Sequence, residues 1–306
     1  MKKVRVNAPA TIANLVCGFD VLGLCVEEPY DEMEVHLLDE KTVIIESTDG
    51  YPLPKDPQLN TAGAPLIEML KEVRENVGFK VILTKNIMPG SGIGSSAASA
   101  AGAVVAANYL LGDRFSKEDL VRFAMFGEKI SSGVKHADNV APGIFGGVVL
   151  VRSIFPLDIV TLPFPELYVS IVHPQITVRT EDARQILRKE VLLKDAIRQW
   201  GNIAGLVAGL IKGDYNLIGR SLEDVIIEPV RSILIPGFDE VKGKSKLAGA
   251  LGGGISGSGP SVFMLSKTRG VAGDVALEME GVYSTLGIPH KTYVSAIASE
   301  GVRVIK

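Results

Sequence analysis

The stretch PGSGIGSSAA, from Pro89 to Ala98, has residue types and a spacing that could bind phosphate. Its three alternating glycines allow positive φ angles and a close approach of the backbone to a ligand. The small-residue segment that follows is predicted to be a helix, and the first amides of a helix lack intrahelical partners and lie at its positive end. Such a helix start binds anions. The alternative is a glycine-rich connection, capped by Ser95 or Ser96, that holds no ligand.

Two common nucleotide-binding motifs do not explain this stretch. A P-loop requires GxxxxGK[ST], and no lysine occurs between Lys85 and Lys117. A Rossmann fingerprint requires GxGxxG, and here serine stands where the third glycine should be. A formal GxGxxG begins at Gly252, but Pro260 and an apolar run follow it where the dinucleotide motif needs a helix. Phosphate binding here would therefore depend on backbone amides and the helix dipole.

Hydrophobic alternation predicts the elements that position this loop. Glu34–Leu38 and Thr42–Glu46 are expected to form a hairpin, a helix is predicted over Asn60–Val77, and the strand Phe79–Thr84 leads to the loop. A capping signature predicts another helix from about 117 to 130. The order of strand, glycine loop and helix would present helix amides to a phosphate.

A second group of polar residues lies near the N-terminus. Val4–Ala8 is predicted as a short strand that Pro9 ends, and the stretch after it is expected to be a surface loop. Its residues Asn14 and Asp20 either line a site or make local turn bonds to backbone amides. The pattern by itself favours the turn bonds.

Two further polar groups occur in the middle of the chain. Glu128 falls near the end of a predicted helix, where it is either a solvated side chain, which the pattern alone favours, or a metal ligand. The sequence HADN, from His136 to Asn139, lies among glycines and a proline, and we interpret it as part of a site.

The second half of the chain begins after a proline-rich boundary near 155–165. It alternates strands and helices, with a helix capped at Thr180 that carries Arg184, and a connection that places Arg231 between two prolines. This order suggests a second α/β layer of split-βαβ type.

Composition limits the kind of protein. The 306 residues suffice for two domains, and 46% hydrophobic with 22% charged residues indicates a globular protein. A net charge of −3 makes a small molecule a better partner than a nucleic acid. Cys17 and Cys25 form neither a disulfide framework nor a zinc motif. No export signal or membrane-spanning run is found, so we expect a cytoplasmic protein without a membrane partner.

Five separated segments resemble a known family. They are APATIANLVCGFD (8–20), PGSGIGSSAA (89–98), HADNVAP (136–142), EPVR (228–231) and ISGSGPS (255–261). The first, second and fifth are similar to the three motifs of the GHMP kinase superfamily, and the other two resemble the homoserine kinases within it. The resemblance runs from one end of the chain to the other.

This resemblance implies an α+β fold of two domains. Residues 1–155 would form the ATP-binding domain, with a left-handed βαβ unit like domain 2 of ribosomal protein S5, and residues 156–306 a ferredoxin-like α/β sandwich. The implied reaction transfers the γ-phosphoryl group of ATP to the hydroxyl of L-homoserine and gives O-phospho-L-homoserine, a step toward threonine. ATP and Mg²⁺ are the implied cofactors. The oligomeric state stays open, with a homodimer as one option.

The resemblance also assigns the reacting groups. Glu128 and Ser96 would hold Mg²⁺ in an oxygen ligand set, and Asn14 would lie near the reacting hydroxyl. We find no convincing general base, so the implied mechanism is alignment, with the proton lost to phosphate or solvent. The implied nucleotide-binding residues are Asn60, Pro89, Gly90, Ser91, Gly92, Ile93, Gly94, Ser95, Ser96, Ala97 and Ala98.

The implied substrate is a zwitterion and needs partners of both charges. By similarity Asp20 would bind its α-ammonium, and Arg184 and Arg231 its α-carboxylate, in charge-assisted hydrogen bonds. His136 and Asn139, together with Asn14, would surround the remainder of the molecule.

The first motif departs from the usual homoserine kinase pattern, which resembles SANLGPGFD. Ile12 replaces the serine, and Val16 and Cys17 replace the Gly-Pro pair, which leaves the backbone path of this loop open. Two alternatives also stay open: a related kinase acting on mevalonate or shikimate, and a catalytically silent nucleotide-binding sensor of the same fold. Mevalonate and shikimate carry no ammonium, so an Asp20 that faces the site argues against them.

Overall fold

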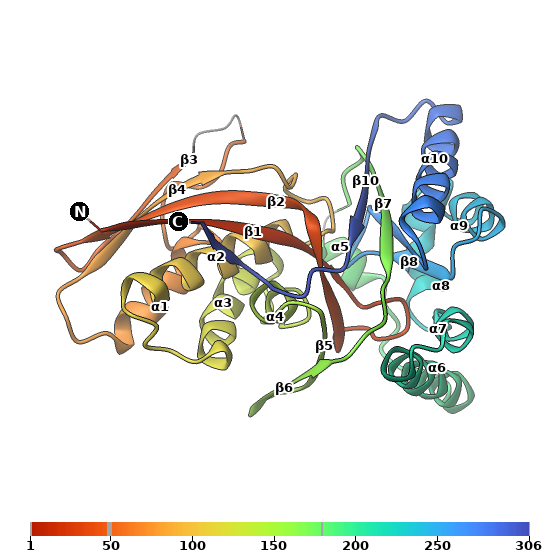
Figure 1. Cartoon of the computed structure of the whole chain (residues 1–306), viewed down its shortest axis with the longest axis horizontal. Coiled ribbons are helices and arrows are strands. Elements are labelled where there is room, and N and C mark those ends of the chain that lie inside the picture. The colour runs from red at the N-terminus through yellow and green to blue at the C-terminus, as the bar shows by residue number, and fades with distance from the viewer. Residues whose placement is uncertain (1, 48–50, 179, 306) are drawn as a thin grey trace.

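The computed structural model describes residues 2–47, 51–178 and 180–305, which form two lobes with one sheet each (Figure 1). The first sheet has the strand order β11-β1-β2-β4-β3, and β5 joins it by pairing with β2 and β6. Its strands are β1 (Lys3–Ala13), β2 (Leu22–Leu38), β3 (Val43–Ser47), β4 (Gly78–Thr84), β5 (Val148–Ile154), β6 (Leu157–Leu162) and β11 (Arg303–Ile305).

Helices cover one face of the first sheet, below it in the view of Figure 1. They are α1 (Gly63–Glu72), α2 (Ser95–Leu110), α3 (Lys117–Ser132) and α4 (Val140–Phe145). The central helix α2 is rich in alanine and buried on most of its surface, and it packs against the other three helices, β1 and β2. Small side chains permit this close packing, which fixes the start of α2 below the glycine loop.

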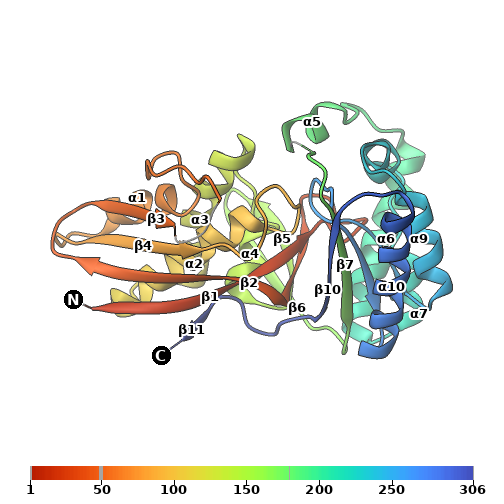
Figure 2. The ribbon, with the colours of Figure 1, turned by 90° about the horizontal axis from the view of Figure 1, so that it is seen from above.

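The second lobe has a four-stranded antiparallel sheet with the order β10-β7-β9-β8. Its strands are β7 (Tyr168–Pro174), β8 (Gly252–Ile255), β9 (Val262–Ser266) and β10 (His290–Ala296). Its helices are α5 (Thr180–Gln185), α6 (Leu193–Lys212), α7 (Tyr215–Ser221), α8 (Glu228–Arg231), the 3-10 helix η1 (Ser232–Leu234), α9 (Phe238–Leu247) and α10 (Arg269–Thr285). Figure 2 shows α5 at the top of the view, apart from the other helices of the second lobe.

Several predicted elements are confirmed. The strand before the glycine loop is β4, the helix after it is α2, and α3 begins with a capping box between Ser116 and Asp119. The α+β class with two sheets is confirmed as well. The helix predicted over Asn60–Val77 is shorter, since α1 covers Gly63–Glu72.

Two strand predictions are wrong. Pro9 does not end the first strand, because β1 continues to Ala13 and its register with β2 shifts between Pro9 and Thr11, where the missing N–H is accommodated. The expected hairpin between 34–38 and 42–46 does not form. β3 pairs in parallel with β4, which lies between β3 and β2. Alternation identified both strands but carried no information about their partners.

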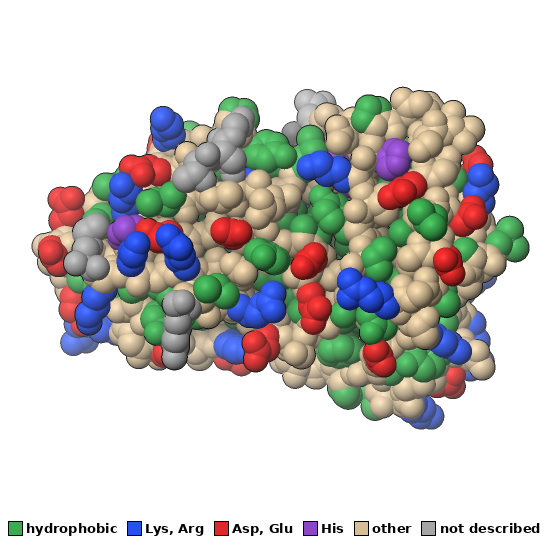
Figure 3. Space-filling view, turned by 45° about the horizontal axis from the view of Figure 1, so that its top comes forward, with side chains coloured by type: hydrophobic (Ala, Val, Ile, Leu, Met, Phe, Trp, Pro, Cys, Tyr) green, Lys and Arg blue, Asp and Glu red, His purple; other side chains and the backbone are tan. Residues whose placement is uncertain are grey.

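Pairing across the two halves of the chain bears on the predicted domain limits. β6 pairs with β5, and β11 returns from the C-terminus to pair with β1. The division into 1–155 and 156–306 therefore stays a prediction. Within the described ranges no helix is long and apolar enough to cross a membrane. On the face in Figure 3, acidic and basic side chains are interspersed over both lobes.

Candidate active site

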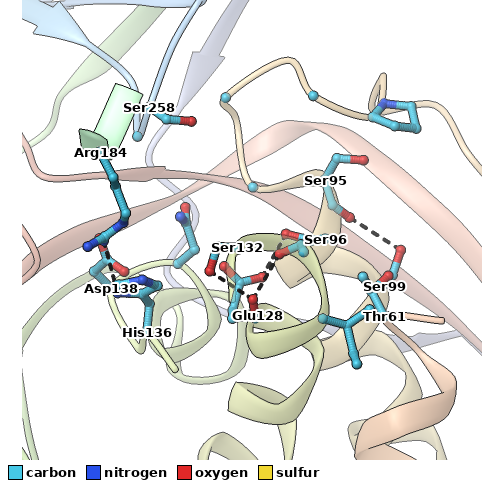
Figure 4. A pocket seen from close by; sticks show the side chains of 18 of the residues that line it. Thr61, Ser95, Ser96, Ser99, Glu128, Ser132, His136, Asp138, Arg184 and Ser258 are labelled. Atoms are coloured by element: carbon cyan, nitrogen blue, oxygen red, sulfur yellow. Dashed lines mark hydrogen bonds between the residues drawn. The ribbon is translucent and has the colours of Figure 1, made fainter. Parts of the chain in front are cut away.

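A cavity of about 400 Å³ lies where the two lobes meet. The glycine loop and the end of α3 line it from the first lobe, and α5, α8 and the loop after β8 line it from the second. Figure 4 shows its two groups of side chains: Ser95, Ser96 and Ser99 from the start of α2, and His136, Asp138 and Arg184 opposite them. Glu128 lies between the two groups.

The glycine loop has the backbone that its sequence predicts. Gly90, Gly92 and Gly94 have φ angles of 77°, 85° and 71°, and α2 begins directly after the last of them. Among the described residues, no backbone carbonyl accepts from the amides of Gly92, Ile93 or Gly94. These amides and the first turn of α2 together form a cradle for an anion.

Residues of the third motif hold the loop from outside, through its carbonyl groups. Ser256 Oγ donates to the Gly92 carbonyl at 2.8 Å, and Ser261 Oγ donates to the Ser91 carbonyl at 2.6 Å. A Cβ on Gly92 would lie 2.5 Å from the Gly259 carbonyl oxygen. A larger residue at 92 would thus push the two loops apart.

A buried ion pair closes the base of the loop, and the sequence motifs gave no indication of it. Lys85 Nζ pairs with Asp31 of β2 and donates to the Ser95 carbonyl at 2.8 Å. The Asp31 carboxylate also accepts the backbone amides of Asn86 and Ile87 at 2.8 and 2.9 Å. Since the charges and hydrogen bonds of the pair are satisfied on both sides of the loop, it fixes where the loop begins and ends.

Glu128 is not a solvated surface residue, since only 6% of it is exposed. Its Oε1 accepts from Ser96 Oγ at 2.7 Å, and burial raises the pKa of the Glu128 carboxyl above its usual value. No basic side chain in the described part of the chain forms an ion pair with it. A buried carboxylate beside a hydroxyl, with no protein cation to balance it, fits a divalent metal ion.

The opposite end of the cavity brings the predicted substrate charges together. Arg184 Nη2 donates to Asp20 Oδ1 at 2.9 Å and lies 3.3 Å from His136 Nδ1. Since an arginine can only donate, His136 Nδ1 is the acceptor and its ring proton is on Nε2. Burial and then Arg184 lower the pKa of His136, so the ring is neutral. Its Nε2 donor has no partner among the described residues.

Arg231 and Asn14 meet at one carbonyl of the third motif. Asn14 Nδ2 donates to the Gly257 carbonyl at 2.9 Å, and Arg231 Nη1 donates to the same oxygen at 3.1 Å. Arg231 lies with its guanidinium 4.9 Å from the ring centre of Phe19. Burial lowers the pKa of Arg231 to about 10, which still leaves it charged at neutral pH.

The first-motif loop turns sharply in spite of its unusual residues. Asn14, Leu15 and Val16 have φ angles of 75°, 41° and 66°, and Asp20 has 60°. This is a costly conformation for a β-branched valine. Asn14 supports the turn, because its Oδ1 accepts the Asp20 amide at 3.0 Å. The loop therefore adopts left-handed backbone angles with the replacement residues in it.

Asp138 is a cavity residue that the sequence analysis did not single out, although it lies within HADN. It is 5% exposed, and burial, Asp20 and Glu128 together raise its pKa to about 7. Ligand atoms of Asp20, His136 and Asp138 lie within 4.8 Å of one another. The Arg184 guanidinium already bonds to Asp20 and His136 of this group, and its positive charge disfavours a metal ion there.

Of the remaining predicted site residues, some line the cavity and others are buried away from it. Asn139 lines the cavity and accepts from Thr11 Oγ1 at 2.9 Å. Asn60 also lines it, but its side chain bonds to the amides of Ala62 and Gly63 and to the Pro54 carbonyl. The side chains of four loop residues are buried away from the cavity: Ser91, Ile93, Ala97 and Ala98.

Comparison with known proteins identifies the family. The N-terminal model of the GHMP kinases matches residues 63–147, and the C-terminal model matches 206–285. A homoserine kinase of Chloroherpeton thalassium is 46% identical over the full length of both chains. The chain belongs to the homoserine kinase family.

Other relatives agree with this membership. The crystal structure of a homoserine kinase from Cytophaga hutchinsonii has a TM-score of 0.95 and 48% identity, covering 100% of this chain and 98% of that one. A homoserine kinase of Methanococcus maripaludis is 41% identical over 89% of this chain and 90% of its own. The crystal structure of an L. major mevalonate kinase has 16% identity and a TM-score of 0.69, covering 97% of this chain and 96% of that one, and this likeness reflects the shared fold alone. This member of the family is an ATP-dependent kinase with the two-domain GHMP fold.

Proposed function

We propose that the cavity binds ATP at the glycine loop and L-homoserine at the Asp20 end, and transfers the γ-phosphoryl group to the homoserine hydroxyl. The observation that carries this proposal is the arrangement of the cavity, with amide donors at one end and an Asp20–Arg184 pair at the other. The first suits phosphates, and the second suits a molecule with both charges.

The Asp20–Arg184 pair explains how a zwitterion would bind. The substrate ammonium would replace Arg184 as the ion-pair partner of the Asp20 carboxylate. The substrate carboxylate would then pair with the guanidinium groups of Arg184 and Arg231. Every charge then keeps a partner as the substrate enters, which a buried site requires. The unpaired Nε2–H of His136 and the Asp138 carboxyl supply further contacts. A hydroxy acid would leave Asp20 without its arginine and without a replacement.

Glu128 and Ser96 are the residues that would hold Mg²⁺ at the nucleotide end. The ion would supply charge neutralisation at the phosphates. The amides of Gly92, Ile93 and Gly94, with the start of α2, bind and orient the phosphates. Lys85 stabilises the glycine loop and does not bind the nucleotide, because its ammonium already pairs with Asp31 and donates to the Ser95 carbonyl.

Asn14 acts through the loop that it supports. Both ends of its amide are used, by the Gly257 carbonyl and by the Asp20 amide, so it sets the position of the Asp20 carboxylate. Its contact with the reacting hydroxyl remains a prediction. Catalysis then depends on alignment of the hydroxyl with the γ-phosphate.

The product would be O-phospho-L-homoserine, an intermediate on the route to threonine. We place the reaction in the cytoplasm, in keeping with two cysteines that are free, buried and inert. Burial raises the pKa of both thiols to about 12. A homodimer remains one option for the assembly.

The decisive experiment measures ADP release by the purified protein with L-homoserine, mevalonate or shikimate as acceptor, and identifies the product by phosphorus NMR. We expect turnover with homoserine well above both others. Comparable turnover with mevalonate or shikimate would replace the homoserine proposal, and ATP binding without turnover on any acceptor would indicate a sensor.

A further inference from the structure

His173 is a buried histidine on β7 that touches both loops at the nucleotide end of the cavity. Its Nδ1 lies 3.3 Å from Ser261 Oγ in the third motif. Its Nε2 lies 3.3 Å from Sδ of Met88, which directly precedes the glycine loop. The residue is only 2% exposed, and it neither lines the cavity nor belongs to a sequence motif.

Alternation along β7 explains why this side chain reaches the first lobe. Ile171 and His173 point to the same face of the strand, and Ile171 packs in one cluster with Ile87, which precedes the glycine loop, and Ile93, which lies within it. Ser170 points to the other face, where its Oγ donates to the Ala272 carbonyl of α10 at 2.7 Å. One strand therefore offers a test residue and a matched control.

The proton positions follow from the geometry. Ser261 Oγ donates its hydrogen to the Ser91 carbonyl at 2.6 Å, so a hydrogen bond between His173 and Ser261 needs the ring proton on Nδ1. With the proton there, Nε2 has no hydrogen for Met88 Sδ, and that 3.3 Å approach is a van der Waals contact. Burial, and then Lys291 opposite it on β10, lower the pKa of His173 to about 4. The ring is therefore neutral, with its proton on Nδ1.

The Ser91 carbonyl and the Gly92 amide belong to one planar peptide group and point in opposite directions. Holding the carbonyl on one side consequently aims the Gly92 N–H to the other side, toward the cavity. We propose that His173 is a positioning residue for ATP: it orients the Ser261 hydroxyl, which together with the Ser261 backbone amide fixes the Ser91–Gly92 peptide for phosphate binding. This inference rests on the proposed role of the glycine loop.

Two substitutions of His173 separate positioning from simple packing. His173→Phe keeps the ring volume but loses the donor, whereas His173→Asn keeps a donor near the Nδ1 position and loses volume. Loss of one hydrogen bond should raise the KM for ATP about five- to tenfold in His173→Phe. The KM for homoserine should stay within about twofold. His173→Asn should retain near-normal KM for ATP although it unfolds at lower denaturant, because it leaves a cavity.

Four further variants complete the experiment. Ser170→Ala should lower stability without changing the KM for ATP. Ser261→Ala should raise the KM for ATP. Adding His173→Phe to Ser261→Ala should not raise this KM further, because both substitutions act through the Ser261 hydroxyl. The inference is overturned if the KM for ATP follows stability across all variants, or if the two substitutions are additive. Gly92→Val tests the loop itself: unchanged ATP affinity there would defeat the loop's proposed role, independently of His173.

Discussion

The glycine loop and the Asp20 end of the cavity are built from different parts of the chain. Between Pro89 and Gly94 the polar groups that face the cavity belong to the backbone, and side chains such as Ser256 and Ser261 hold that backbone from behind. At the other end the groups are charged side chains, Asp20 and Arg184, carried by an irregular loop and a short helix. Recognition by backbone depends on shape, whereas recognition by side chains depends on charge.

This difference predicts opposite sensitivities. Substitutions at the loop should act by adding volume, even when they change no charge. Substitutions at the Asp20 end should act by removing charge, even when they keep the shape. The following variants test that contrast, from the largest expected effect to the smallest.

Gly92→Val should abolish ATP binding measurable by calorimetry, a loss of at least about a hundredfold. The new side chain would meet the Gly259 carbonyl, and a valine is strained at a φ of 85°. Gly112→Val is the matched control, because Gly112 has a φ of 78° at the far end of α2 and open space around it. Equal losses of ATP affinity in both variants would mean that strain alone, not contact with the third motif, is responsible.

Glu128→Gln should lower turnover at limiting Mg²⁺ by roughly ten- to a hundredfold, and high Mg²⁺ should partly restore it. A neutral amide is a poorer ligand for a hard dication than a carboxylate of the same shape. Glu118→Gln, at an exposed position of the same helix, should leave the Mg²⁺ dependence unchanged. If Glu128→Gln has the same Mg²⁺ dependence as the wild type, the carboxylate does not hold the metal.

Asp138→Asn should change how stability depends on pH. Folding raises the pKa of Asp138 from 3.8 to about 7, so the folded protein holds this proton more tightly and loses stability as pH rises between these values. The asparagine variant has no such loss. Its stability relative to wild type, from urea unfolding, should increase by on the order of 2 kcal/mol between pH 5 and pH 8. A difference independent of pH would show that Asp138 does not titrate in this range.

The sequence predicted the backbone of the glycine loop better than the arrangement of the Asp20 end of the cavity, for a physical reason. A strand, three spaced glycines and a helix start lie together in the chain, so local rules describe them, and the φ angles agree. The Asp31–Lys85 pair and the parallel pairing of β3 with β4 join residues that are distant in sequence, and no local pattern encodes them. Asp138 was missed because a buried acid cannot be distinguished from an exposed one by residue type.

The first motif also shows that sequence patterns do not reveal contacts between residues distant in the chain. Its residues were identified, but resemblance assigned Asp20 and Arg184 to different groups of the substrate, whereas the structure bonds them to each other. Only the fold brings these residues together across more than half of the chain. Because Asp20 and Arg184 pair with each other, the proposal that each binds one charge of the substrate becomes a single testable exchange of ion-pair partners.

The central claim is that Asp20 recognises an ammonium, and one comparison tests it directly. The measurement is kcat/KM of wild type and Asp20→Asn for L-homoserine and for 4-hydroxybutyrate, which lacks the amino group. Because the Asp20 side chain is 34% exposed, its loss should cost less than in a fully buried pair, about tenfold to a hundredfold for homoserine. The preference for homoserine over 4-hydroxybutyrate should shrink by a similar factor, and the KM for ATP should hardly change. If Asp20→Asn phosphorylates homoserine with wild-type kcat/KM and keeps the full preference, Asp20 does not bind the ammonium and the proposed substrate site is wrong.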